Sequence, residues 1–190
     1  MSRAYRVSVS ESERKVVRGS DHVCTCIELL QILPKEDMAT LLSEELQSRG
    51  FTLEDDRIVR REGDVTISID PATGEVTVQA SLSEEVELTE KVSGWGDEDY
   101  GADGRRKVEE NLRKRAEEGL QRQAKSKENR LTQQATEQLE NALRELQPEL
   151  DGAVNKVTAA ALKQKAAQLG EIKQITEDTD NGSMTIVLEV

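Results

Sequence analysis

The sequence predicts an α+β protein: a small, mostly antiparallel sheet with one packed helix, a long charged helical arm and a C-terminal β-hairpin that returns to the sheet. Apolar and polar residues alternate as in strands before residue 92 and after residue 170. Between them, apolar residues recur every three or four positions from about Arg105 to Gly170, which indicates one face of a helix. Aromatic residues make up 2% and charged residues 34% of the chain, which favours a small aliphatic core with a solvated extension.

The first segment, from Ala4 to Ser10, alternates apolar and polar residues and is predicted to be a half-buried strand. A polar break at residues 10–13 follows it. Residues 14–18 are predicted to form a second short strand or a turn of helix, which ends at Gly19. Residues 22–30 are predicted to form a further strand, because their apolar side chains share one face.

A packed helix is predicted after Pro34, since the missing amide of proline costs nothing in a first helical turn. Glu36 and Asp37 follow at the positive end of the helix dipole, and Gly50 is a natural left-handed stop. The buried stripe of this helix is predicted to be Met38, Leu41, Leu42 and Leu46.

Residues 57–80 are predicted to form a three-stranded meander. Its second turn lies at residues 70–74, where Pro71 presets φ and Gly74 accepts a positive φ. Val86 and Leu88 are expected to add an exposed edge strand.

Residues 93–104 contain four glycines, an acidic patch and Trp95. So few apolar residues predict a mobile linker. The predicted organisation is an N-terminal α+β module at 1–92, this linker at 93–104, a helical arm at 105–170 and a C-terminal β-hairpin at 171–190 that docks on the N-terminal sheet. Asn181-Gly182 between two β-prone runs predicts the turn of that hairpin.

Pro148 interrupts the arm, and a proline inside a helix costs about 3 kcal/mol. Two arrangements are open: a helix that ends near Leu146 before a second helix, or one rod that kinks. The first is favoured, because Glu149 and Asp151 would then lie in the positive first turn of a new helix. The arm would be a helical hairpin that packs on itself. An intermolecular coiled coil is less favoured, because no strict seven-residue repeat is present.

The formal net charge of −12 argues against a general nucleic-acid binder, because binding phosphates requires clustered basic residues. Basic residues nevertheless crowd residues 105–130, which suggests a contact with an acidic surface, although a solvated helix face explains them as well. Without an apolar run of about 18 residues, no membrane insertion is predicted, and we expect a soluble, cytoplasmic protein. The candidate interaction residues are Arg105, Arg106, Arg113, Lys114, Arg122 and Trp95.

His22, Cys24 and Cys26 are the candidate metal ligands. Residues two apart on a strand point to the same side, so these side chains would supply three of the four ligands that zinc needs. The chain has no other histidine or cysteine, and the fourth ligand would be Glu28, a water or a partner residue. The favoured interpretation is that both cysteines are ordinary strand residues.

No catalytic constellation is predicted. Side chains two apart on one strand lie about 7 Å from each other, too far for His22 to activate a neighbouring thiol directly. The carboxylate clusters lie in predicted loops, and the phosphate-binding P-loop pattern does not occur. We therefore expect no enzymatic activity and no cofactor.

Several stretches of the chain carry a resemblance to known proteins: residues 1–7, 20–23, 29–34, 46–51, 165–172 and 186–190. They resemble a bacterial family, the FtsH ternary system domain, and the resemblance covers nearly the whole chain. It implies a component encoded beside an FtsH-like AAA+ ATPase and further accessory domains, in gene systems proposed to act in biological conflict or defence. The family has no defined active site to transfer.

The predicted function is a non-enzymatic accessory or adaptor protein that acts through protein–protein contacts. Its expected partners are the FtsH-like ATPase and other components of the same system, and a homo-oligomer is also open. The alternative is a metal-binding or redox module that uses His22, Cys24 and Cys26. A third hypothesis is nucleic-acid binding through residues 105–130.

Overall fold

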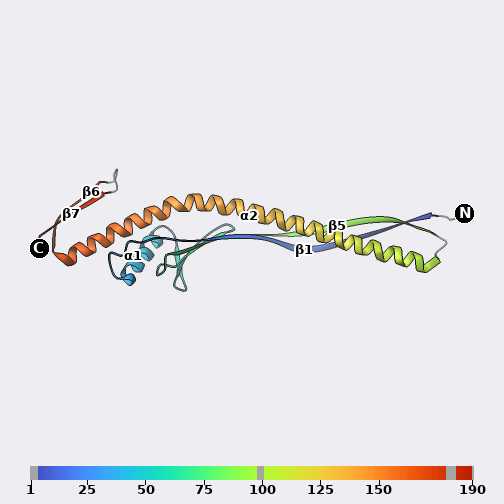
Figure 1. Ribbon diagram of the computed structural model, residues 1–190, viewed down its shortest axis with the longest axis horizontal. Coiled ribbons are helices and arrows are strands. Elements are labelled where there is room, and N and C mark those ends of the chain that lie inside the picture. The colour runs from blue at the N-terminus through green and yellow to red at the C-terminus, as the bar shows by residue number, and fades with distance from the viewer. Residues whose placement is uncertain (1–3, 98–100, 179–182, 190) are drawn as a thin grey trace. The chain divides into compact units, whose positions relative to one another are not determined.

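The computed structural model describes residues 4–97, 101–178 and 183–189, and it confirms the α+β class. The chain divides into two compact units. Unit 1 comprises residues 1–21 and 81–136, and unit 2 comprises residues 22–80 and 137–190. The elements (Figure 1) are β1 (Ala4–Cys26), α1 (Lys35–Ser48), β2 (Thr52–Glu54), β3 (Arg57–Glu62), β4 (Val65–Ile69), β5 (Glu75–Asp97), α2 (Gly101–Leu169), β6 (Glu171–Asp178) and β7 (Ser183–Glu189).

Five strands form one sheet in the order β1-β5-β4-β3-β2, in which β2 to β5 are antiparallel neighbours. The register pairs Ile58 with Ile69 and Ile67 with Val78, so the buried positions of successive strands share one face. The predicted antiparallel sheet and the meander at residues 57–80 are confirmed. β1 is a terminal strand of the sheet.

Both long strands run through predicted breaks. β1 has 23 residues without interruption at 10–13 or 19–21, and β5 has 23 residues and includes Val86, Leu88 and Trp95. The prediction of a linker at residues 93–104 is wrong for the described part of this range. β5 reaches Asp97 and α2 begins at Gly101. Residues 98–100 lie outside the described residues. Pairing satisfies the backbone of such polar stretches, and a strand needs only one apolar face.

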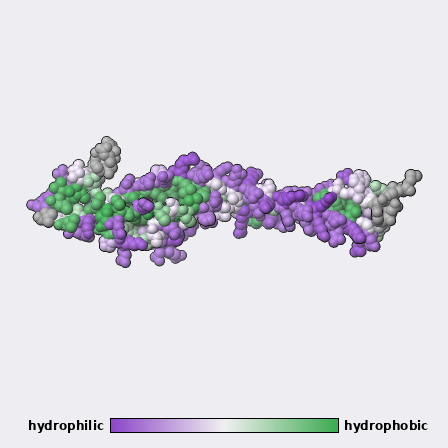
Figure 2. Space-filling view, viewed as in Figure 1, coloured by the Kyte–Doolittle hydropathy of each residue, from purple (hydrophilic) through white to green (hydrophobic). Residues whose placement is uncertain are grey.

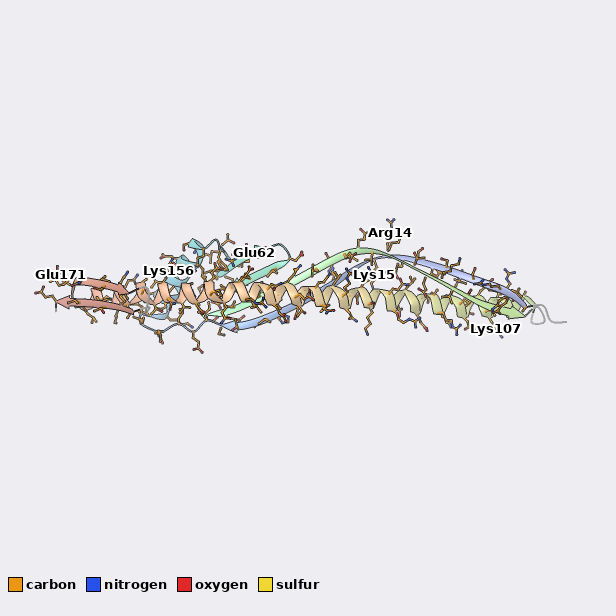
Figure 3. All side chains as sticks on the ribbon, turned by 90° about the horizontal axis from the view of Figure 1, so that it is seen from above. Arg14, Lys15, Glu62, Lys107, Lys156 and Glu171 are labelled. Atoms are coloured by element: carbon orange, nitrogen blue, oxygen red, sulfur yellow. The ribbon has the colours of Figure 1, made fainter. Side chains whose placement is uncertain are left out.

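Unit 1 has a thin core between its strand residues and α2. It consists of one aliphatic cluster, in which Leu82 packs at the margin and the buried members are Val17, Val86, Leu88, Leu120, Ala124 and Leu131. Ion pairs border it: Lys15 lies beside α2 and contacts Glu128, whereas Arg14 points away and contacts Glu87 (Figure 3).

At Gly19, β1 packs closely against α2 in unit 1. A Cβ atom at this position would lie 2.2 Å from the Thr132 nitrogen and 2.4 Å from the Leu131 carbonyl carbon. Because these are backbone atoms, they cannot move aside independently. The sequence therefore needs glycine here for close packing, and Gly19 does not interrupt the strand as predicted.

In unit 2, the sheet packs its apolar face against both helices. The predicted helix is confirmed as α1, which buries Met38, Leu42 and Leu46. Arg49 at its end donates from Nη1 to the Glu149 carbonyl of α2 at 3.0 Å. The buried strand residues include Ile58, Ile67, Ile69, Val76 and Val78.

α2 is one helix of 69 residues that contains Pro148, and Figure 1 draws it without interruption. The predicted break near Leu146, and with it the helical hairpin, is therefore wrong. Contacts on both sides of the proline account for the continuity. Leu146 and Ala153 are buried, and Glu149 is held by Arg49 and Arg60. These contacts offset the roughly 3 kcal/mol cost of an interior proline.

The C-terminal β-hairpin is confirmed as β6 and β7, but these strands form a separate two-stranded sheet. The hairpin therefore does not extend the five-stranded sheet, and its predicted return to that sheet is not confirmed. A register irregularity between Ile172 and Gln174 lets Ile172 and Ile175 share one face, opposite Leu188 and Ile186. The Asn181-Gly182 turn lies outside the described residues. In the described residues, no helix is long and apolar enough to cross a membrane.

Replacing Gly19 with alanine is expected to destabilise the protein by about 1–3 kcal/mol, because the new methyl group overlaps backbone atoms of α2. Chemical denaturation measures this change. Ser20→Ala, at the exposed neighbouring position, serves as the control and is expected to stay within about 0.5 kcal/mol of the wild type. Equal stabilities of the two variants would contradict the close packing of β1 on α2.

Replacing Pro148 with alanine is expected to stabilise the protein by up to about 3 kcal/mol, because the substitution restores a backbone donor inside a continuous helix. Thermal and chemical denaturation measure the change, with Gln147→Ala at the exposed preceding position as the control. A loss of stability would instead indicate that the proline is needed to start a second helix.

Candidate functional site

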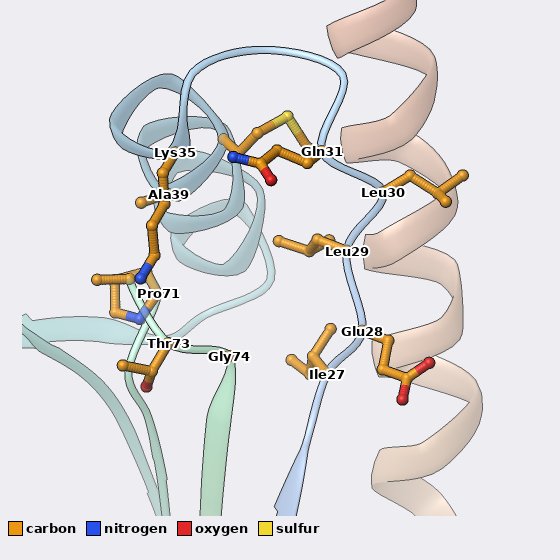
Figure 4. Close-up of a pocket in the computed structure, with 12 residues that line it drawn as sticks. Ile27, Glu28, Leu29, Leu30, Gln31, Lys35, Ala39, Pro71, Thr73 and Gly74 are labelled. Carbon is orange, nitrogen blue, oxygen red and sulfur yellow. The ribbon is translucent and has the colours of Figure 1, made fainter.

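Residues 27–31 form an extended segment between β1 and α1 in unit 2. Figure 4 shows that Ile27 and Leu29 point to one side of it, whereas Glu28 and Leu30 point to the other side, towards α2. The backbone–backbone hydrogen bonds within this described segment are few: Ile27 donates to the Gly74 carbonyl at 2.7 Å, and Leu30 accepts from Ile32 at 2.9 Å. The segment is therefore extended but is not part of a sheet.

A cavity of about 620 Å³ lies on the α1 side of this segment, and we call it the α1 hollow. Its walls are residues 27–31, the start of α1 at Lys35, Met38 and Ala39, and the turn at residues 71–74. Leu30 also lines it and is 67% exposed, although its side chain points to the α2 side of the segment (Figure 4). A single exposed aliphatic residue is ordinary on a protein surface, so it is the cavity beside it that makes this segment a candidate contact.

Gly74 fixes the turn that forms the far wall of the α1 hollow. Its φ is +76°, and a Cβ atom would lie 2.5 Å from the Ile27 carbonyl oxygen. Asp70 stabilises the same turn, because its carboxylate accepts from the Ala72 amide at 2.8 Å. The Thr73 hydroxyl, followed by the Ala72 amide, holds the pKa of Asp70 below its ordinary value. The position and shape of this wall therefore depend on the left-handed conformation of Gly74 and on the carboxylate of Asp70.

A second cavity, of about 610 Å³, lies between the end of β1 and α2, and we call it the α2 groove. Its strand side includes Val23, Cys26 and Glu28. The helix side is a single stripe with steps of three and one residues, as one face of an α-helix requires. That stripe is Leu143, Leu146, Gln147, Leu150, Asp151 and Val154.

The α2 groove is apolar at its base and acidic at its edges. Leu146 is buried, Leu150 and Val154 are half-buried, and both Glu28 and Asp151 are exposed. Among the described residues, the ion pairs include no partner for either of these carboxylates. The groove therefore carries unbalanced negative charge beside aliphatic surface.

An ion pair between sheet and helix positions the groove. Arg60 of β3 donates from Nη1 and Nη2 to the two carboxylate oxygens of Glu149 at 2.8 and 2.9 Å, and its guanidinium lies 4.3 Å from the Phe51 ring centroid. Glu149 raises the pKa of Arg60 above its ordinary value. We call this bidentate ion pair between Arg60 and Glu149 the fork. It fixes the rotation of α2 about its own axis, and so directs the stripe from Leu143 to Val154 towards β1.

The candidate metal ligands His22, Cys24 and Cys26 are not grouped as a metal site requires. Among the described residues, no group of three or more histidine, cysteine, aspartate or glutamate side chains is placed to hold a metal ion. Both cysteines are exposed thiols; Cys24 Sγ lies 3.7 Å from the Thr77 hydroxyl, and Cys26 lines the α2 groove. His22 is exposed at the same end of β1. The metal or redox alternative finds no support in this arrangement.

The predicted interaction residues lie on unit 1, where most are exposed and some have acidic partners within the chain. Arg105 contacts Glu109 at 3.1 Å, and Arg113 contacts Glu11 at 3.8 Å. The basic residues begin near the start of α2, where Lys107 is labelled in Figure 3. Trp95 is 71% exposed, and Arg106, Lys114 and Arg122 are exposed as well. Of these residues, Arg122 lines a cavity of about 330 Å³ together with Glu118, Gln121 and Lys125, which is smaller than the two cavities described in unit 2.

Sequence reasoning missed both cavities of unit 2. Glu28 and Asp151 are far apart in the sequence, and only the folded chain brings them to one groove. One local signal was present: five of the seven residues 27–33 are apolar, all but Glu28 and Gln31, which is more than a strand with one exposed face requires. In Figure 2, hydrophobic residues gather on the visible face over the part of unit 2 formed by α2 and the β6–β7 hairpin.

Replacing Gly74 with alanine is expected to destabilise unit 2 by about 2 kcal/mol or more, because the methyl group meets the Ile27 carbonyl in addition to the left-handed strain. Gly63→Ala is the matched control: its φ is +59° and nothing lies within 4 Å of its Cβ position. The control should cost only about 1 kcal/mol. Denaturation and hydrogen exchange of residues 27–31 measure both, and equal effects would contradict the contact.

Comparison with known proteins identifies the family. A search of curated proteins and a search of solved structures found no match. The family model described as FtsH ternary system domain X5 matches residues 1–190, which is the full length of the chain. This agrees with the resemblance in the N-terminal stretches and the tail. The chain therefore belongs to the FtsH ternary system domain X5 family and is, as that name implies, an accessory domain of an FtsH ternary system.

Proposed function

We propose that this chain is a non-enzymatic adaptor, which binds the FtsH-like AAA+ ATPase or another component of its ternary system through the surface at residues 27–31. The observation that carries the proposal is the extended segment with a large cavity on each side of it, the α1 hollow and the α2 groove. A role of the whole system in biological conflict or defence, and a cytoplasmic location, are part of the same proposal.

The α1 hollow is suited to receive a side chain of a partner. Ligand cavities are concave, mostly apolar and about 300–1,000 Å³ in volume, and this one has 620 Å³ with Leu29, Leu30 and Met38 among its walls. Leu30 is 67% exposed, and its side chain lies on the α2 side of the segment that lines this cavity. Burying it under a partner would contribute roughly 1.5–3 kcal/mol.

The test is co-purification of the tagged full-length chain with the FtsH-like ATPase of the same system, followed by affinity measurement. Leu30→Asp is expected to weaken binding by about tenfold or more, as loss of a central apolar contact does. Leu53→Asp is the control, because Leu53 is 56% exposed on β2 and lies outside both cavities; it should leave affinity nearly unchanged.

A chain that stays monomeric and does not bind the ATPase or any other component of the system would contradict the adaptor function. Equal losses for Leu30→Asp and Leu53→Asp would support an adaptor but place its binding surface elsewhere. Catalytic turnover by the purified chain alone would contradict the non-enzymatic part of the proposal.

A further inference from the structure

The α2 groove lies along the end of β1, and this position suggests that an extended peptide could add to the sheet there. β1 is a terminal strand of the five-stranded sheet, so one of its edges has no strand neighbour among the described residues. An extended peptide that pairs with such an edge gains main-chain hydrogen bonds, and its alternate side chains enter neighbouring pockets. The α2 stripe lies across the groove from the last residues of β1, and would receive those side chains.

The walls of the groove indicate aliphatic side chains in the occupant. Val23 on the strand side is 37% exposed, and on the helix side Leu143, Leu150 and Val154 are half-buried. These four residues present branched aliphatic surface without aromatic rings. An incoming valine, leucine or isoleucine would bury this surface and its own at about 25 cal/mol per Å².

The edges of the groove indicate a positive charge in the occupant. Glu28 enters from the extended segment, where Figure 4 shows it on the α2 side, and Asp151 comes from α2. Both are exposed, and among the described residues neither has an ion-pair partner. Two carboxylates beside one apolar groove attract a lysine or arginine and repel an acidic segment.

We propose that the α2 groove binds an extended segment of a partner protein, with aliphatic side chains on the groove floor and a lysine or arginine between Glu28 and Asp151. The proposal rests on the adaptor function and specifies the chemistry of the partner. It also specifies which part of the surface selects the partner by charge. The α1 hollow, on the other side of residues 27–31, supplies apolar contact.

The first experiment selects binders of the immobilised full-length protein from a random twelve-residue peptide library. Enriched peptides are expected to combine aliphatic residues with lysine or arginine. The doubly charge-reversed variant, Glu28→Lys with Asp151→Lys, should lose that enrichment and bind a selected basic peptide about tenfold more weakly, since each exposed ion pair contributes up to about 1 kcal/mol.

A control variant carries the same change in net charge outside the groove. Glu137→Lys with Glu140→Lys alters two exposed acidic residues of α2 in unit 2 that do not line the groove. It should bind the selected peptide as the wild type does. Enrichment of peptides without basic residues, absence of any selected peptide, or equal weakening by the two variants would overturn the proposal.

The two cysteines provide a second, independent measurement. Cys26 lines the groove and Cys24 contacts Thr77, and both are exposed. A bound peptide is expected to slow the maleimide labelling of Cys26 in the Cys24→Ser variant, and to change the labelling of Cys24 in the Cys26→Ser variant much less. Equal protection of both thiols, or protection of neither, would overturn the assignment of the peptide to this groove.

Failure of this inference can be distinguished from failure of the adaptor function. If the charge-reversed variant still co-purifies with the FtsH-like ATPase at wild-type affinity, the adaptor function stands and the groove is not the charge-selective contact. If the wild type selects basic peptides that bind in the groove but binds no component of the system, the groove does prefer aliphatic segments with a lysine or arginine, and the proposed partner is wrong.

Discussion

The arrangement of unit 2 depends on the fork between Arg60 and Glu149. The side chains of these residues are only 18% and 24% exposed, so each would remain partly desolvated without the other. The fork joins β3, an inner strand of the sheet, to α2 one residue after Pro148, where a proline would otherwise favour a kink. Arg49 adds a bond to the Glu149 carbonyl. One glutamate thus receives contacts from both the sheet and α1, and the helix direction is fixed where its own hydrogen bonding is weakest.

This fixed helix defines the α2 groove, and Gly74 fixes the opposite side of residues 27–31. The segment is tied at Ile27 by a bond to the Gly74 carbonyl, whereas the residues after it have few backbone partners. Walls held in place on both sides of this extended segment would lower the conformational cost of the proposed binding, because they need not become ordered when a ligand arrives. The proposed recognition at residues 27–31 would therefore depend on the Arg60–Glu149 pair and on Gly74 as well as on the residues that contact the ligand.

Local chemistry made part of this fold predictable. Pro34 and Gly50 bracket α1 correctly, because capping preferences act within a few residues, and Asp70 to Gly74 form the expected turn for the same reason. The helix break predicted at Pro148 was wrong, because the free-energy cost of an interior proline is visible in the local sequence. The contacts that offset this cost come from Arg60 and Arg49, which are about 90 to 100 residues away. The breaks predicted at the polar stretches of β1 were also wrong, because pairing with the neighbouring strand satisfies the backbone hydrogen bonds of these residues. The groove could not be predicted, because Glu28 and Asp151 meet only through that distant packing.

The basic residues at the start of α2 looked like the stronger interaction candidate because charge is visible in a sequence, whereas cavities are not. In the fold, Arg105 and Arg113 meet Glu109 and Glu11, so part of this charge is balanced within unit 1. Exposed pairs of this kind contribute little free energy. At the α2 groove the opposite holds: fewer charges are present, but Glu28 and Asp151 lie beside apolar surface that a ligand would cover. An opposite charge brought there is screened less by water, so in the proposed function the carboxylates of Glu28 and Asp151 would select a partner more sharply than basic residues that are solvated or already paired.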